Sequence, residues 1–127
     1  MTEMMRQVTE THWAEAYESA RQEVEMIREA TSPVEEITTE PARYFLSDDE
    51  MSGLVVRESG EVVGLFSRVK GRGDALVIAA IENGGRTLDC FDGYLPTLYG
   101  RHGFEEVKRE ANWTPGGPDV VFMELVA

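Results

Sequence analysis

The first part of the chain carries an apolar pattern of helical period. Apolar residues recur there at the spacing of one helix face. They are Trp13, Ala16, Tyr17, Ala20, Val24 and Ile27. We predict an amphipathic helix that packs this stripe into the core, ends at Thr31-Ser32-Pro33 and follows a short strand over residues 4–9.

The pattern is less regular between the first helix and Gly53. Ser32-Pro33-Val34-Glu35 has the form of a capping box with proline at the first helical position, which predicts a short second helix. For residues 38–52 we predict a mobile connection or a further helical turn. The acidic run Asp48-Asp49-Glu50 is either a solvated loop or a wall that attracts a cationic substrate.

From Gly53 onward the pattern changes to strands. Residues 54–57 and 62–66 are apolar and flank Glu58-Ser59-Gly60-Glu61, which predicts an antiparallel hairpin. Residues 76–83 then form an apolar helix that ends at Gly84-Gly85. Residues 88–91 predict a short central strand.

The last part of the chain predicts one more helix and two more strands. Asp92 is placed to cap the helix, Pro96 lies in or near its first turn, and Gly103 ends it. Residues 104–110 and 119–126 predict two strands around a turn rich in glycine and proline. The order of elements predicts an α+β fold, a central mixed sheet flanked by helices with two parallel crossovers near its centre.

Length and composition predict one folded domain. A chain of 127 residues can bury one sizeable core, and 42% hydrophobic with 28% charged residues argues against disorder. We therefore predict a single domain over residues 1–127, with an acidic helical part over 1–50 and a sheet part over 52–126.

The chain is strongly acidic. Its 24 acidic and 12 basic side chains give a net charge of −12, and residues 1–50 alone hold 13 acidic and four basic ones. This balance disfavours direct binding to nucleic acid or to an anionic membrane, and it favours a basic or amine-bearing substrate. Most of these carboxylates are expected to lie on solvated helix faces.

Cysteine and histidine are too few for a disulfide or a zinc-type cluster. Cys90 is the single cysteine and the chain has two histidines, so we predict no metal site. Nothing near Cys90 signals a lowered thiol pKa, and we interpret it as a buried strand residue. The N-terminus lacks the apolar core of a signal peptide, and no apolar run approaches the roughly 18 residues that span a bilayer, so we expect a cytoplasmic protein.

A basic, glycine-spaced turn precedes the apolar helix: Lys70-Gly71-Arg72-Gly73-Asp74-Ala75. The glycines permit a tight turn that presents backbone N–H groups, and the helix adds its positive N-terminal end. With Arg68, three of the chain's 12 basic residues lie within five positions. The turn therefore suits a pyrophosphate.

These residues resemble a known family. Lys70-x-x-Gly73-x-Ala75 resembles the Arg/Gln-x-x-Gly-x-Gly/Ala loop of the GNAT N-acetyltransferase superfamily. Asp92-x-x-Leu95-x-x-x-Tyr99 with Gly103-Phe104 resembles that family's Asn-x-x-Ala-x-x-x-Tyr motif and Gly-Phe ending. The match covers about residues 52–126, and residues 88–96 are similar to a variant found in small GNAT-like proteins of bacteriophages and prophages.

The resemblance implies a GNAT-like acyl-CoA acyltransferase fold and transfer of acetyl from acetyl-CoA to an amine by direct attack. In this family a main-chain N–H stabilises the oxyanion, and Tyr99 would be the general acid that protonates the departing thiolate. A long strand supplies backbone contacts to pantetheine, a role that Val62 to Val69 either fills or leaves degenerate. The resemblance places these residues at coenzyme A: Arg68, Val69, Lys70, Gly71, Arg72, Gly73, Asp74, Ala75 and Asp92.

The general base is less well defined. Leu88 and Cys90 would face one side of the central strand, and Asp89 would be buried on the other, where a carboxylate needs a partner or a function. Asp89 is therefore our candidate. Glu58, the 48–50 run and a base that acts through water remain alternatives.

Two functions follow from these expectations. The first is an N-acetyltransferase that acts on an amine-bearing small molecule or protein, with a homodimer left open. The second is a non-catalytic interaction protein on the same fold, a phage-borne accessory factor whose acidic N-terminal part binds a basic partner. Binding of acetyl-CoA distinguishes them.

Overall fold

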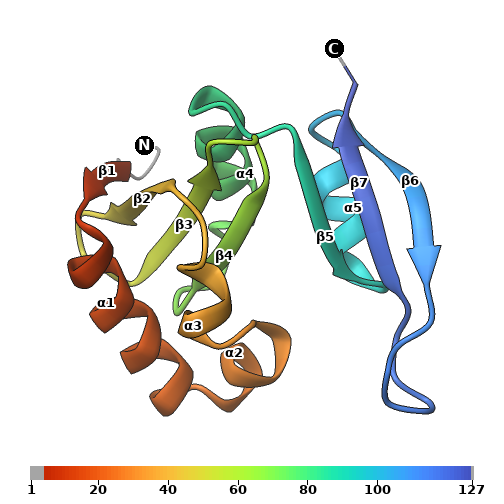
Figure 1. Ribbon diagram of the computed structural model, residues 1–127, viewed down its shortest axis with the longest axis horizontal. Coiled ribbons are helices and arrows are strands. Elements are labelled where there is room, and N and C mark those ends of the chain that lie inside the picture. The colour runs from red at the N-terminus through yellow and green to blue at the C-terminus, as the bar shows by residue number, and fades with distance from the viewer. Residues whose placement is uncertain (1–4, 127) are drawn as a thin grey trace. The chain divides into compact units, whose positions relative to one another are not determined.

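The computed structural model describes residues 5–126 and divides into two compact units, 1–85 and 86–127 (Figure 1). Each unit is described by itself. The single domain expected over residues 1–127 stays a prediction.

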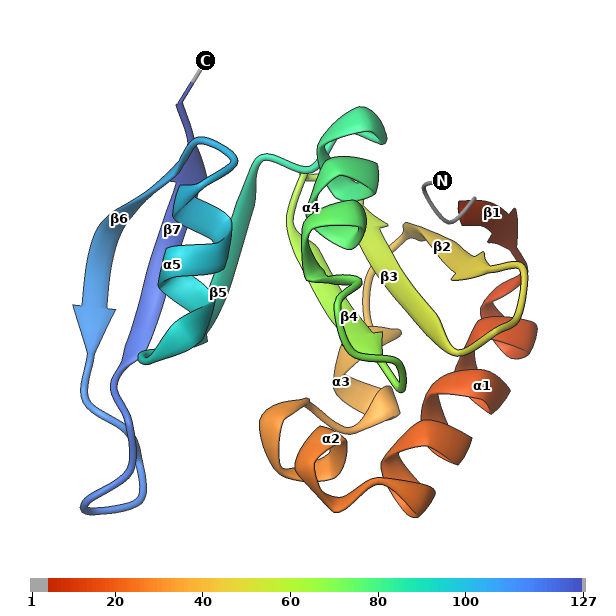
Figure 2. The same cartoon turned by 180° about the vertical axis from the view of Figure 1, so that it is seen from behind.

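The first unit is a four-stranded antiparallel sheet with helices on both faces (Figures 1 and 2). Its strands lie in the order β1 (Met5–Val8), β2 (Ala42–Ser47), β3 (Ser52–Arg57) and β4 (Val62–Ser67). Its helices are α1 (Glu10–Glu23), α2 (Glu25–Ala30), α3 (Val34–Ile37) and α4 (Gly73–Glu82). α1 contacts β2 on one face, and α4 contacts β3 and β4.

The core on the α1 face is aromatic. The rings of Trp13 and Tyr17 stack with centroids 4.4 Å apart, and Phe66 of β4 meets both rings edge-on. Trp13 and Tyr17 are fully buried, so the predicted stripe is confirmed as core packing. The single long helix is corrected: the backbone of Val24 is extended, which ends α1 at Glu23 and places Ile27 on α2.

The sequence prediction for residues 38–52 was wrong. Residues 42–47 form β2, which lies between β1 and β3 in the sheet. Tyr44, Phe45 and Leu46 are all buried, because α1 covers one face of this strand and the other face is also packed. A strand buried on both faces shows no alternation of apolar and polar residues, and this hid β2 in the sequence.

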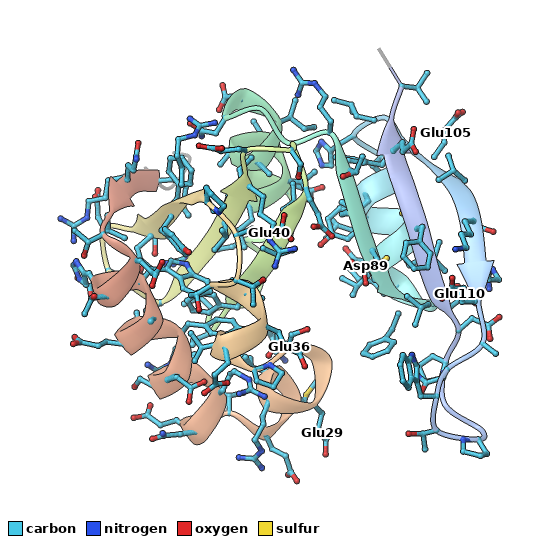
Figure 3. The ribbon with its side chains drawn as sticks, in the orientation of Figure 1. Glu29, Glu36, Glu40, Asp89, Glu105 and Glu110 are labelled. Atoms are coloured by element: carbon cyan, nitrogen blue, oxygen red, sulfur yellow. The ribbon has the colours of Figure 1, made fainter. Side chains whose placement is uncertain are left out.

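The predicted capping box is also wrong. Pro33 is the N-cap residue of α3, and no side chain caps this helix. The helix is fixed at its other end, where Arg57 Nη2 donates to the carbonyls of Glu36 (2.8 Å) and Ile37 (3.3 Å). Glu40, labelled in Figure 3, and Glu61 balance the Arg57 charge at 3.1 Å and 2.7 Å.

The second unit is a three-stranded antiparallel sheet with one helix. β5 (Thr87–Phe91) and β6 (Phe104–Glu110) both pair with β7 (Val120–Leu125), and α5 (Tyr94–Gly100) joins β5 to β6. The core of this unit consists of buried side chains from α5 and from all three strands. They are Leu88, Cys90, Leu98, Tyr99, Phe104, Val121 and Met123.

The α+β class with flanking helices is confirmed, and the pairing refines the predicted mixed sheet. β5 and β6 run in the same direction because both are antiparallel to β7, so the crossover through α5 is present. The crossover through α4 links β4 and β5, which belong to different sheets.

β4 contains a bulge at Gly64–Leu65. The pairing steps from Gly53↔Phe66 to Val55↔Val63, so two steps along β3 match three along β4. Gly64 has φ +61°, and a Cβ on it would lie 2.7 Å from two ring carbons of Trp13. Both the backbone and the packing therefore require glycine here.

We expect Gly64→Ala to destabilise the protein by about 2–5 kcal/mol, the sum of the left-handed backbone cost and overpacking against Trp13. Gly71→Ala is the matched control, because Gly71 also has positive φ (+85°) but nothing lies within 4 Å of a Cβ there. It should lose only about 1–2 kcal/mol. Urea unfolding measures both, and equal losses would contradict a role for the Trp13 contact.

Candidate functional site

The turn between β4 and α4 presents backbone N–H groups. α4 begins at Gly73 with Arg72 as its N-cap residue, and the first helical bond of the turn runs from Leu76 N to Arg72 O (3.0 Å). The N–H groups of the first turn therefore make no hydrogen bond inside the helix. Gly71, with φ +85°, lets the chain reverse just before them.

Two of the three basic side chains predicted to charge this turn are bound to carboxylates of the same unit. Arg68 pairs with Glu23 at the end of α1. Arg72 pairs with Asp49 through two nitrogens, Nη2–Oδ2 at 2.6 Å and Nη1–Oδ1 at 3.0 Å. Lys70 is exposed. The local positive charge of the turn thus comes mainly from the Lys70 ammonium group and from the N-terminal end of the α4 dipole.

Local hydrogen bonds hold the backbone of residues 67–69, between β4 and the glycines of the turn. Ser67 Oγ donates to Val69 O at 2.6 Å and accepts from Val69 N at 3.1 Å. Arg68 N donates to Met51 O at 2.7 Å, which ties the exit of β4 to the start of β3. Asp74 lies in the first turn of α4.

Ion pairs also occupy the acidic run at 48–50. Glu50 contacts Arg6 Nη2 at 3.2 Å and His12 Nε2 at 2.9 Å. Hydrogen bonds from Arg72, Ser47 and the Met51 amide hold the pKa of Asp49 well below its usual range. A carboxylate with such a depressed pKa is a poor general base, so Asp49 does not suit that role.

Tyr99 is a buried phenol on the β5 side of α5. Its side chain is 6% exposed and meets the Phe104 ring edge-on at 5.9 Å. Burial, with smaller contributions from Cys90 and Asp89, raises the pKa of Tyr99 above its usual value. The hydroxyl therefore stays protonated at neutral pH, but it is a weaker acid than an exposed phenol.

Asp89 lies on β5 with its side chain exposed (Figure 3), and the prediction that it is buried is wrong. Leu88 and Cys90 do share one face of the strand, as predicted, and both are buried, so alternation places Asp89 and Phe91 on the opposite face of the sheet. No helix of this unit, within residues 86–126, covers that face. Glu58, the alternative base, is exposed in the hairpin turn.

Asp92 does not cap α5, which corrects the sequence prediction. The N-cap residue is Gly93, and the Asp92 carboxylate accepts from Gly93 N at 3.0 Å and from Arg109 Nη1 at 2.7 Å. The Arg109 hydrogen bond, followed by that of Gly93, lowers the pKa of Asp92. Arg109 thus compensates the charge that aspartate adds where the family motif has asparagine.

The bulge in β4 is the backbone feature that the sequence prediction missed. Gly64 inside the apolar run 62–66 was its signal, because an isolated glycine in a strand pattern indicates a bulge or a close approach. With β2 counted, β4 is the fourth strand of its sheet and leads directly into the turn. A bulge leaves one residue of the ladder without its regular partner.

Cys90 is buried, and its surroundings oppose a nucleophilic role. Burial, followed by the charges of Asp89 and Asp92, raises the pKa of its thiol to about 12. The structure shows no cluster of three potential metal ligands among residues 5–126. None of the helices in this range is long and apolar enough to cross a bilayer.

We expect Cys90 to resist alkylation in the native protein. Compared with a free thiol of pKa near 8.5, its thiolate fraction should be lower by roughly a thousandfold or more. Iodoacetamide labelling followed by intact mass gives a single site, since the chain has one cysteine. The same protein in urea is the control, and native labelling as fast as in urea would contradict the buried thiol.

No family model matches the chain, and no curated protein matches it. Two solved structures match over nearly all of both chains. The apo form of YjaB from Escherichia coli, a GNAT-family protein, has a TM-score of 0.59 and 14% identity over 100% of this chain and 99% of that one.

The second is a crystal structure of a protein provisionally named a phosphinothricin N-acetyltransferase. It matches with a TM-score of 0.57 and 16% identity over 98% of this chain and 99% of that chain. At such identities the likeness concerns the fold. The architecture predicted from the two motifs is confirmed, and the chain has the fold of the GNAT N-acetyltransferase superfamily.

Proposed function

We propose that the protein is an acyl-CoA-dependent N-acyltransferase that transfers acetyl from acetyl-CoA to an amine. The observation that carries the proposal is the segment from β4 through the turn to α4, in a chain with a GNAT fold. Its first-turn N–H groups and the open space at Gly71, where nothing lies within 4 Å of a Cβ, fit a pyrophosphate held by backbone.

In this proposal the turn residues divide into two groups. The backbone over residues 70–75, with the Lys70 ammonium, holds the phosphates. Arg68 and Arg72 act indirectly, because their guanidinium groups already bind Glu23 and Asp49. Asp92 lies at the start of the α5 segment with its charge balanced by Arg109.

The reactive groups come from the chain and from the cofactor. Acetyl-CoA supplies an activated acetyl thioester. In this proposal a main-chain N–H stabilises the oxyanion, and Tyr99 donates a proton to the sulfur that leaves. For the base we retain Asp89, whose exposed carboxylate accepts the amine proton through water; Glu58 remains the alternative.

The acceptor is an amine-bearing small molecule or protein. A net charge of −12 attracts a protonated amine over long range and raises its rate of encounter. The general base then removes the proton that the amine must lose to become a nucleophile.

Binding of acetyl-CoA is the first test. At a concentration 100 times the dissociation constant, a specific ligand stabilises the native state by about 2.7 kcal/mol. Thermal unfolding with millimolar acetyl-CoA should therefore show a clear rise in Tm, and calorimetry should give a single site. Absence of both effects would contradict the proposal and favour the non-catalytic interaction protein.

Tyr99→Phe tests the general acid. Removal of the hydroxyl should lower the rate of thiol release across a panel of amines by about 10²- to 10⁴-fold while coenzyme A affinity stays near that of the wild type. Tyr94→Phe is the matched control on the same helix, because Tyr94 is 63% exposed and should leave the rate unchanged. An unchanged rate in Tyr99→Phe would remove Tyr99 from the mechanism.

Lys70→Ala tests the phosphate contact. The loss of one exposed charge should weaken coenzyme A binding by about 2- to 5-fold and reduce its dependence on salt. Lys108→Ala removes the same charge from β6, where Lys108 pairs with Glu110 at 2.6 Å, and should change neither quantity. If Lys70→Ala binds with the same salt dependence as the wild type, the phosphates lie elsewhere.

A further inference from the structure

The turn between β2 and β3 is tied to the start of α4. Asp49 in this turn binds Arg72, the N-cap residue of α4, through two nitrogen–oxygen pairs at 2.6 Å and 3.0 Å. The two residues are 23 positions apart in the sequence. A paired guanidinium and carboxylate fix orientation as well as distance.

Neighbouring groups complete this network. Asp49 Oδ1 also accepts from Ser47 Oγ at 2.7 Å and from Met51 N at 3.0 Å. Arg72 Nη1 also donates to Ser52 Oγ at 2.7 Å, and both serines are fully buried. The Arg72 side chain is only 19% exposed, so its guanidinium is held against the sheet.

Because of where Arg72 lies, this network also restrains the turn before α4. Arg72 stands between Gly71, a flexible residue with positive φ, and the first-turn N–H groups of α4. The Arg72 side chain does not cap this helix end. It binds Asp49 and Ser52 instead and so anchors this backbone to the sheet.

We propose that Asp49 is a positioning residue for the phosphate site: by holding Arg72, it keeps the backbone of residues 70–75 in its binding shape before the ligand arrives. This inference rests on the proposed function, since the ligand is the pyrophosphate of coenzyme A. Backbone that is ordered in advance does not lose conformational entropy on binding, and affinity rises accordingly.

If Asp49 competed with the ligand for Arg72, neutralisation of Asp49 would change the affinity for the ligand in the opposite direction. If Asp49 merely competed with a phosphate for Arg72, its neutralisation would release the guanidinium and strengthen binding. In the positioning arrangement, neutralisation loosens the turn and weakens binding. One substitution therefore distinguishes the two.

Asp49→Asn is that substitution, and Asp48→Asn is its matched control. Both remove one negative charge from the same turn, and both residues are exposed, but it is Asp49 that binds Arg72. Calorimetry with coenzyme A should give about 2- to 5-fold weaker binding for Asp49→Asn, the loss expected from one partly exposed ion pair, and no change for Asp48→Asn. Unchanged or tighter binding by Asp49→Asn would overturn the proposal.

A double-mutant cycle tests whether the two residues act as one unit. Arg72→Met, alone and with Asp49→Asn, should weaken binding by about the same factor as Asp49→Asn, because each change breaks the same pair. Additive losses would mean that Arg72 contacts the ligand by itself, which overturns the proposal.

Hydrogen exchange provides a test without ligand. Amides of residues 70–75 should exchange faster in Asp49→Asn than in Asp48→Asn, while those of β2 and β3 keep their rates. Unchanged exchange at 70–75, or faster exchange spread over the whole unit, would overturn positioning. If the wild type fails to bind coenzyme A, the proposed function fails. Hydrogen exchange still tests whether Asp49, through Arg72, orders the backbone of residues 70–75.

Discussion

The first unit depends on the contact between the Trp13 ring and the backbone of β4 at Gly64. The ring is fully buried, and a Cβ on Gly64 would lie within 2.7 Å of it, so helix and strand approach as closely as glycine allows. Trp13 Nε1 is buried without a hydrogen-bond partner among the described residues, a cost of about 1–3 kcal/mol. Burial of a large aromatic surface offsets that cost. The contact therefore fixes both the position of α1 and the bulge in the strand that leads to the turn.

Local patterns predicted the second half of the chain well. Residues 54–57, 62–66 and 88–91 lie in strands and residues 76–82 lie in a helix, as their apolar spacing and glycines indicated. The fold could be predicted from two short motifs. Their glycines and tyrosine stand at fixed spacings, and such spacings reflect local requirements that residues close in the sequence determine. β2 escaped notice because burial on both faces removes the alternation that marks a strand.

The details of the candidate site were less predictable, because they depend on partners that are distant in the sequence. Asp92 was expected to cap a helix but binds Arg109, 17 residues away. Arg68 and Arg72 were expected to add positive charge to the turn, but each pairs with a carboxylate, 45 and 23 residues away. The exposure of Asp89 likewise depends on what covers its sheet. A sequence shows which charges the chain has, whereas only the fold shows which of them neutralise one another.

The bulge in β4 also affects how this strand can associate with other chains. β4 is the last strand in the pairing order of its sheet, and a regular last strand is a template for aggregation. A bulge with a left-handed glycine interrupts the even spacing of N–H and C=O groups that a neighbouring protein strand would need. The same irregularity therefore discourages regular β-pairing between this strand and a strand of another chain.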